Sequence, residues 1–226
     1  LSLNFGDSSL HACGNQPILW LRAQGVRSAR QLWLLAKTAQ TEFKEAIPQN
    51  SPLGLVFYPT QAELDGAPAE PDLPKLCVYK DMGWAIMRNS WKDDATMLGI
   101  KSGFTWNHAH ADAGSFILFH KGEAILIDSG NCWYAKPEYD SDYRQSRAHN
   151  VVLFNGEGEN PEDAYHGSKF PGAILHAIDA GDLQYALADA TGPVSQHFIR
   201  NYRTFLWIAD VILIIDDLMT PRCGKV

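Results

Sequence analysis

The chain has 226 residues, 46% of them hydrophobic, and carries a formal net charge of −7. Its length allows one large domain or two small ones, its acidic balance argues against nucleic-acid binding, and it has no apolar run long enough to span a bilayer. Its four widely spaced cysteines include no CxxC pair, so they indicate neither a disulfide framework nor a zinc ribbon.

The first part of the chain favours helices over residues 17–47. Pro17 and Gly25 suit the start and end of a short helix, and Ser28 is a candidate N-cap for the next. Apolar residues then recur at steps of three and four, which predicts one buried helical face, at Leu32, Leu35, Ala39, Phe43 and Ile47. Pro48 ends this pattern, and the Pro-, Ala- and acid-rich residues 61–74 predict a loop or linker.

From residue 76 onward the pattern changes to short β-type runs with glycine-containing turns, which predicts an antiparallel sandwich. The expected strands cover residues 76–79, 84–88, 96–101, 115–120, 124–128, 150–154, 173–178, 183–188, 197–208 and 211–216. The clearest hairpin runs from Ser115 to Asp128 and turns at Lys121 and Gly122. Because both faces of this hairpin are apolar, we expect it to be central and covered on both sides.

Three polar side chains stand at the ends of these runs: His110, Asp128 and His149. The two ends of the hairpin meet at one edge of the sheet, so His110 can approach Asp128, and His149 can join them if the run that follows it is a neighbouring strand. Two imidazoles and one carboxylate suit a zinc ion with a fourth position left for water. A buried polar pair without a metal is the competing interpretation, and residue chemistry alone leaves both open.

Other side chains near this group are candidates for catalysis or substrate contact. His108 shares an extended face with His110, and a phenol from Tyr134, Tyr139 or Tyr143 can act as acid or base beside a cation. Four tryptophans can stack on sugar rings or pack at the core edge: Trp84, Trp91, Trp106 and Trp133. A local basic cleft in this acidic protein can come from Arg88, Lys92, Arg144 and Arg147. The sequence Asn155-Gly156-Glu157-Gly158 indicates a turn rather than a phosphate-binding loop, because no helical pattern follows it.

These motifs together resemble the heparinase II/III-like family of polysaccharide lyases over about residues 76–160. The resemblance rests on Arg88-Asn89-Ser90-Trp91, on residues 107–116, on Ile127-Asp128-Ser129-Gly130 and on His149-Asn150-Val151-Val152. It implies an N-terminal (α/α) toroid joined to a C-terminal antiparallel β-sandwich. Residues 1–60 are then expected to be the tail of the toroid with its linker, and residues 61–226 an incomplete sandwich domain.

The resemblance also implies roles for single residues. His110, Asp128 and His149 match a structural zinc site. His108 matches a histidine that faces the uronate, and Tyr134 resembles a tyrosine near the substrate, with Tyr143 as an alternative. Arg88, Trp106 and Arg147 are the expected substrate contacts.

The expected reaction is β-elimination on a uronic-acid glycan of the heparan sulfate or alginate type. The expected partners are an acidic polysaccharide and a second copy in a homodimer, without nucleic acid or a membrane. The substrate class implies a periplasmic or secreted location, although the chain shows no signal peptide. Because the principal catalytic residues of the family lie in the toroid, the chain, which resembles a piece cut at both ends, is expected to be nearly inactive alone.

Two other functions compete with this one. The first is a non-catalytic carbohydrate-binding sandwich whose metal only holds the fold. The second is a cupin-like metal oxygenase or isomerase, since Gly103 followed by His-x-His resembles the first cupin motif. The expected glutamate after the second histidine is absent, with Asp112 the nearest acid, which disfavours the cupin interpretation.

Overall fold

The computed structural model describes residues 3–6, 16–39, 52–104, 110–160 and 169–226. Contacts divide the chain into two compact units, His11–Pro74 and a second unit that joins Lys75–Val226 to the start of the chain. The boundary between the two units follows residue 74, whereas the domain boundary expected from the family resemblance follows residue 60. Among the described residues, no helix combines the length and hydropathy needed to cross a membrane.

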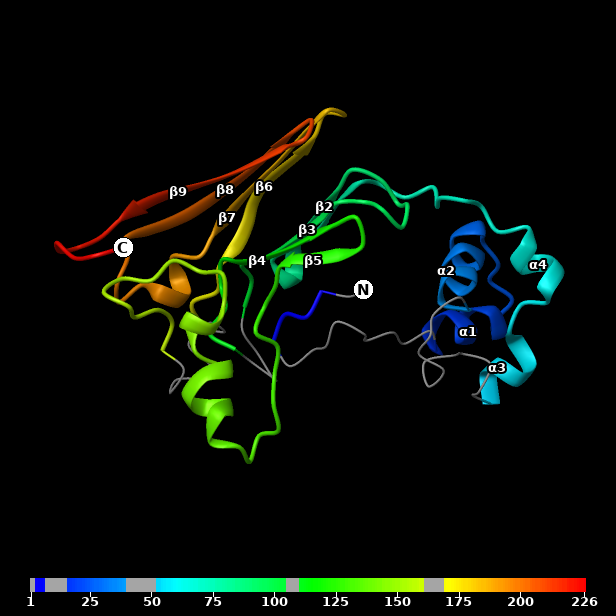
Figure 1. Cartoon of the computed structure of the whole chain (residues 1–226), viewed down its shortest axis with the longest axis horizontal. Coiled ribbons are helices and arrows are strands. Elements are labelled where there is room, and N and C mark those ends of the chain that lie inside the picture. The colour runs from blue at the N-terminus through cyan, green and yellow to red at the C-terminus, as the bar shows by residue number, and fades with distance from the viewer. Residues whose placement is uncertain (1–2, 7–15, 40–51, 105–109, 161–168) are drawn as a thin grey trace. The chain divides into compact units, whose positions relative to one another are not determined.

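The first unit is helical (Figure 1). Its helices are α1 (Gln16–Ala23), α2 (Ala29–Ala39), α3 (Pro52–Phe57) and α4 (Gln61–Asp65). The first two confirm the predicted helices, with Ser28 accepting a bond from the Gln31 amide, while residues 40–47 of the predicted pattern lie outside the described residues. α4 corrects the prediction of a loop after residue 60: Thr60 and Glu63 form a reciprocal capping box, a start signal that the Pro-rich composition obscured.

The second unit is a sandwich of two antiparallel sheets (Figure 1). The first sheet has the order β1-β2-β3-β4-β5 and the second has the order β6-β7-β8-β9, so every neighbouring pair in both sheets is consecutive along the chain. The strands of the first sheet are β1 (Leu76–Tyr79), β2 (Trp84–Arg88), β3 (Met97–Lys101), β4 (Ser115–His120) and β5 (Glu123–Leu126). Those of the second are β6 (Ala173–Asp179), β7 (Leu183–Asp189), β8 (Arg200–Ile208) and β9 (Val211–Met219).

Short helical turns connect some of these strands. They are η3 (Lys80–Met82), the π-helical turn η4 (Tyr139–Tyr143), η5 (Ser146–Ala148) and η6 (Gly192–Val194). Both η4 and η5 lie in the long segment between β5 and β6, far from any strand in sequence. The two antiparallel sheets confirm the predicted antiparallel sandwich.

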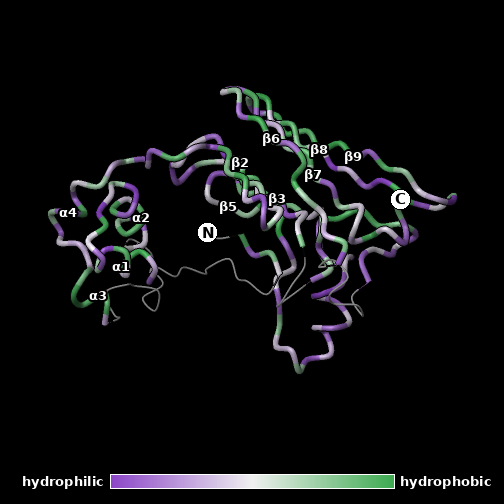
Figure 2. Tube along the Cα trace, turned by 180° about the vertical axis from the view of Figure 1, so that it is seen from behind, coloured by the Kyte–Doolittle hydropathy of each residue, from purple (hydrophilic) through white to green (hydrophobic). Residues whose placement is uncertain are grey.

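The core of the sandwich lies between its two sheets. Alternate residues of β2 and β3 face alternate residues of β6, β7 and β8, and the buried set is Ala85, Met87, Leu98, Ile100, Ile174, Ala186, Ala188, Phe205 and Trp207. Figure 2 shows the hydrophobic residues concentrated along these strands, while the segment that follows β5 is more hydrophilic. Because side chains of a strand alternate between its two faces, one side of each of these strands lies in this core.

The hairpin of β4 and β5 has the predicted turn but not the predicted burial. Lys121 and Gly122 both have positive φ, as a two-residue turn of the hairpin type requires. β5 is an edge strand, however, and all four of its residues are exposed, so the expectation of a central hairpin was wrong. The predicted strand over residues 150–154 is also absent, apart from one bridge between Phe154 and Glu157.

Candidate metal centre

Three chain segments meet at one end of the first sheet. His110 precedes the start of β4, Asp128 follows the end of β5, and the turn η5 delivers His149. The backbone amide of Ala111 donates to the carbonyl of Arg144 over 2.9 Å, which joins the first segment to the third. The predicted approach of His110 to Asp128 thus follows from the hairpin, whereas His149 arrives through a helical turn rather than through a neighbouring strand.

The side chains of His110, Asp128 and His149 form a buried group. Each offers a ligand atom within 4.8 Å of the others, and their exposed fractions are 1%, 2% and 9%. Asp128 accepts on its two oxygens from His149 Nδ1 at 2.5 Å and from the Gly130 amide at 2.9 Å. The rings of His110 and His149 lie 5.2 Å apart. We call this group the metal triad.

The donor set of the metal triad fits a divalent metal ion. His149 Nε2 is buried and has no hydrogen-bond partner within the described part of the chain, a costly arrangement unless another group is bound there. Two imidazoles and a carboxylate are the ligands that zinc takes in three-ligand sites. The residues present could therefore hold zinc through His110, Asp128 and His149.

Electrostatics around the metal triad favour the charged form of His149. Burial lowers the pKa of this imidazole, but the bond to Asp128 and the charges of Asp112 and Asp128 outweigh burial, so the pKa lies above its usual value. Protonation and metal binding compete for the same ring, because a metal ligand must be neutral imidazole.

A buried ion pair lies beside the metal triad and was not predicted from the sequence. Lys101, the last residue of β3, donates to Asp112, and the side chains are 9% and 0% exposed. Burial would raise the pKa of Asp112, yet Lys101 together with the nearby His149 and His110 holds it below its ordinary value. The sequence motifs indicated Asp112 only as an inadequate cupin ligand, although an acid two residues from a candidate ligand was a signal for such a pair.

Residues from remote parts of the chain also support the ligand segments. Asn4 donates to the backbone carbonyl of Asp128 over 3.3 Å, and Asn150 donates to the carbonyls of Phe116 and Ile127 over 2.9 and 3.1 Å. Arg203 of β8 donates to the carbonyls of Gly114 and Asn150, at 3.0 and 2.6 Å, and forms a forked ion pair with Asp216. No local sequence pattern indicates contacts between residues so far apart, so these hydrogen bonds were not predicted.

Aromatic rings extend from the metal triad towards solvent. The Tyr139 ring lies 6.0 Å from His110 and 4.7 Å from Tyr134, edge to face in both cases. Tyr134 is 54% exposed, so part of its ring faces solvent while it packs against Tyr139. Tyr139 opens the π-helical turn η4, a rare element that is frequent at functional sites, and its ring stands between the triad and the predicted catalytic tyrosine.

The predicted basic cleft is dispersed. Arg88 pairs in register with Met97 at the end of the sheet opposite Ser115, and its guanidinium packs over Trp91 at 3.6 Å. Burial lowers the pKa of Arg88. Arg144 pairs with Asp140, and Arg147 lies 3.8 Å from Asp142. The substrate contacts of Arg88 and Arg147 stay predictions, as do those of His108 and Trp106, which lie outside the described residues.

Comparisons with known proteins agree with this architecture. The model of the heparinase II/III-like C-terminal family matches residues 71–222. A heparin-sulfate lyase of Bacteroides stercoris is 36% identical over 81 residues, which are 33% of this chain and 12% of that protein.

Solved structures share the fold at low sequence identity. A heparinase III gene product and a heparan sulfate lyase from Pedobacter heparinus superpose with TM-scores of 0.64 and 0.62 at 19% and 18% identity. Each covers 99% of this chain, which in turn covers 30% of either protein. The chain therefore spans less than a third of the length of these relatives.

Proposed function

The chain belongs to the heparinase II/III-like C-terminal family, as its motifs predicted, and from this premise we propose that it is the sandwich part of a polysaccharide lyase. The proposed reaction is β-elimination in a uronic-acid glycan. The observation that carries the proposal is the metal triad, which groups three buried donors from distant segments inside the region that the family model covers.

The chemistry of β-elimination sets the requirements of such a site. The proton at C5 of a uronate is weakly acidic while the neighbouring carboxylate is ionised. An enzyme must therefore neutralise the carboxylate, remove the proton with a base and protonate the leaving oxygen at C4. A phenol or an imidazole can carry out the proton transfers, so paired catalytic carboxylates are unnecessary.

Tyr134, with Tyr143 as the alternative, is a described side chain that suits a proton transfer in this scheme. Its exposure leaves the phenol accessible, and its edge-on contact with Tyr139 limits the positions that the ring can adopt. His108 is proposed to face the uronate and to take part in substrate binding or catalysis. The family resemblance assigns the remaining catalytic groups to a toroid domain.

Zinc is the proposed metal, held by His110, Asp128 and His149. When bound, it supplies positive charge and fixes the geometry of three loop segments, a structural use rather than activation of a hydrolytic water. The side chains of this chain then keep the wall of the site in place: Asn150 and Arg203 hold the backbone next to the ligands, and Tyr139 packs against the His110 ring.

The proposed substrate is of the heparan sulfate type rather than alginate, because the curated relative is named a heparin-sulfate lyase and the similar structures are named heparinase III and heparan sulfate lyase. An acidic polysaccharide is then the partner. A periplasmic or secreted location is proposed from that substrate class alone.

The test is release of unsaturated uronate, followed by its ultraviolet absorbance, from heparan sulfate and alginate. An intact polypeptide that carries this chain is expected to act on heparan sulfate, and the 226-residue chain alone is expected to show little turnover. Tyr134→Phe in the intact polypeptide should reduce kcat by about 100-fold or more if the phenol transfers a proton. Tyr185→Phe, in β7 of the second sheet, is the matched control.

Two results would refute the proposal. Absence of unsaturated products from every polyuronate would exclude the lyase, and full activity of Tyr134→Phe would remove the tyrosine from the mechanism.

A further inference from the structure

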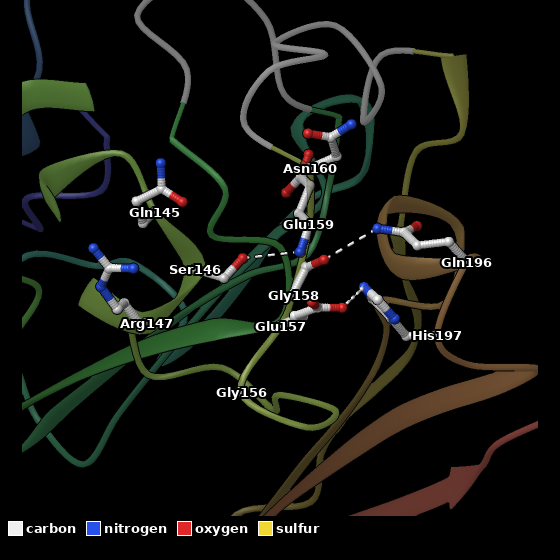
Figure 3. A pocket seen from close by; sticks show the side chains of 10 residues that line it. All are labelled: Gln145, Ser146, Arg147, Gly156, Glu157, Gly158, Glu159, Asn160, Gln196 and His197. Carbon is white, nitrogen blue, oxygen red and sulfur yellow. Dashed lines mark hydrogen bonds and ion pairs between the residues drawn. The ribbon is translucent and has the colours of Figure 1, made fainter. Parts of the chain in front are cut away.

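A polar pocket of about 400 Å³ lies beside η5 (Figure 3). None of its lining residues belongs to the metal triad. It is lined by residues 145–147, 156–160 and 196–197. These residues present amide, carboxylate, hydroxyl, guanidinium and imidazole groups together with glycine backbone, and no aliphatic side chain. The volume lies within the range of small-molecule sites, but the lining lacks the apolar surface that most such sites have.

The walls of the pocket are fixed by hydrogen bonds between its three segments. Ser146 accepts from the Glu159 amide over 2.9 Å and donates to the Ala111 carbonyl over 2.7 Å. Gln196 donates to the Gly158 carbonyl over 3.0 Å (Figure 3). A Cβ at Gly158 would lie 2.4 Å from the Ser146 side chain, so only glycine allows this approach. The pocket is therefore formed before any ligand arrives.

The charges around the pocket oppose one another. The carboxylates of Glu157 and Glu159 offset the guanidinium of Arg147, and Nε2 of His197 lies 3.8 Å from Glu157. Arg147 also lies 3.8 Å from Asp142, so part of its charge is already matched. A sulfate or carboxylate placed here would meet two carboxylates, which disfavours an anion.

Side-chain amides and carboxylates suit a ligand with several hydroxyl groups. Amides donate and accept, carboxylates accept, and vicinal hydroxyls can do both. Gln145, Asn160 and Gln196 place side-chain amides at the pocket, two of which already donate one hydrogen each within the chain, to the carbonyls of Asp140 and Gly158. Glu157, 69% exposed at its side chain, supplies an accessible carboxylate. A sugar ring without a charged substituent meets these conditions.

The pocket and the metal triad are formed by adjoining segments of the chain. Ser146 and Arg147 lie in η5, whose end is capped by His149, and Ser146 donates to the carbonyl of Ala111, the residue after His110. A glycan bound near the triad therefore has a second polar surface available along its length.

We infer that this pocket binds an uncharged, hydroxyl-bearing sugar ring of the glycan, as a subsite separate from the metal triad. The inference rests on the proposed function for the identity of the polymer, while the chemistry of the pocket comes from its own residues. Arg147 then stands at its rim rather than at the centre of an anion site.

The experiment is an NMR titration of the 226-residue chain with an unsulfated hexasaccharide of alternating glucuronate and N-acetylglucosamine. The largest shifts are expected at the amides of Gly156 and Gly158 and at the side-chain amide of Gln196. Asn160→Trp, which places a large ring over an exposed position of the pocket, should weaken binding by about tenfold or more. Asp210→Trp adds the same ring at the exposed turn between β8 and β9 and should not.

A second variant protects the test against misfolding of Asn160→Trp. Glu157→Gln keeps the size of an exposed side chain and should weaken binding by a few-fold, since one charged acceptor is lost. The inference is overturned if the hexasaccharide causes no shifts at the pocket, or if both variants bind it as the unaltered chain does.

These outcomes are separable from those of the lyase assay. Pocket binding without any unsaturated product from the intact polypeptide would retain the subsite and refute the proposed reaction. Elimination activity without hexasaccharide shifts at the pocket would retain the proposed reaction and refute the subsite.

Discussion

The interior between the two sheets and the edge that carries the metal triad are equally inaccessible to water but differ in chemistry. The interior is dominated by a cluster of apolar side chains, including Phe205, Met87 and Ile100 at 0% exposure. The edge buries ionisable groups instead, among them Asp112 at 0% and His110 at 1%. Burial of apolar surface stabilises the first region directly, whereas the second is stable only while each charge has a partner.

This difference predicts that the two regions respond to substitution in different measurements. Substitutions in the interior should lower the free energy of unfolding but leave the metal affinity of the folded chain unchanged. Damage to the edge should alter both. The predictions that follow test this separation, from the largest expected effect to the smallest.

Breaking the buried ion pair should have the largest effect. Lys101→Met leaves the carboxylate of Asp112 buried without its cation, and should cost about 3–5 kcal/mol of unfolding free energy. The double variant Lys101→Met with Asp112→Leu should recover much of this loss, because no charge is then stranded. Urea unfolding measures both values, and a double variant less stable than the single would show that the pair does not act as a unit.

Truncation in the interior should have a similar cost but a different signature. Phe205→Ala removes a fully buried ring of β8 and should lower the free energy of unfolding by about 3–5 kcal/mol. Its zinc Kd at low temperature should equal that of the unaltered chain. A tenfold weaker Kd would show that the interior and the metal site are not separable.

The strands that enclose the interior were predicted from the sequence, because β-forming runs between turn signals act locally. Which face of each strand is buried was not predicted, since β2 is apolar on both faces and β7 buries Gln184 on the same face as Ala186. The approach of His110 to Asp128 could also be predicted, since a hairpin brings its own two ends together. The contacts of Asn4 with Asp128 and of Arg203 with Gly114 could not be predicted, because they join residues 124 and 89 positions apart in sequence through side-chain lengths that no pattern encodes.

Two further errors have a shared physical origin. β5 is apolar on both faces, which suggested burial, yet the strand is an exposed edge. The apolar run 150–154 suggested a ladder, yet the side chain of Asn150 bonds to the neighbouring carbonyls of Phe116 and Ile127. In both cases the sequence shows that a segment is hydrophobic, but not which other segments lie beside it.

Arg203 is the residue that connects the two regions, so its substitution sharpens the comparison. Arg203→Lys keeps the charge but loses the fork that holds Asp216 together with the carbonyls of Gly114 and Asn150. We expect a loss of about 1–3 kcal/mol in unfolding free energy, together with weaker zinc binding. Arg200→Lys, on the same strand and paired with the exposed Asp217, is the control and should change neither.

The smallest expected effect is a pH dependence of the metal-free chain. The raised pKa of His149 means that the folded state holds this proton more tightly than the unfolded state. The resulting stabilisation is fully present below a pH of about 6.5 and is lost as the pH rises through the folded pKa, by up to about 1.4 kcal/mol per pH unit. Urea unfolding in EDTA from pH 6 to 9 measures this slope.

Two comparisons check the origin of that slope. His149→Gln should flatten it, whereas His176→Gln, at an exposed position of β6, should not. Excess zinc should reverse the trend over the lower part of the range, since binding requires the neutral ring. A slope that His149→Gln leaves intact would assign the effect to other groups.

The most direct test of the central claim is the zinc content and zinc Kd of the purified chain, measured by elemental analysis and by competition with a chelating dye. The metal triad predicts one zinc ion per chain, and a loss of affinity of about 100-fold or more in His149→Ala and Asp128→Asn but none in the exposed control His176→Ala. Failure of the unaltered chain to bind zinc, or undiminished binding by both triad variants, would contradict the account.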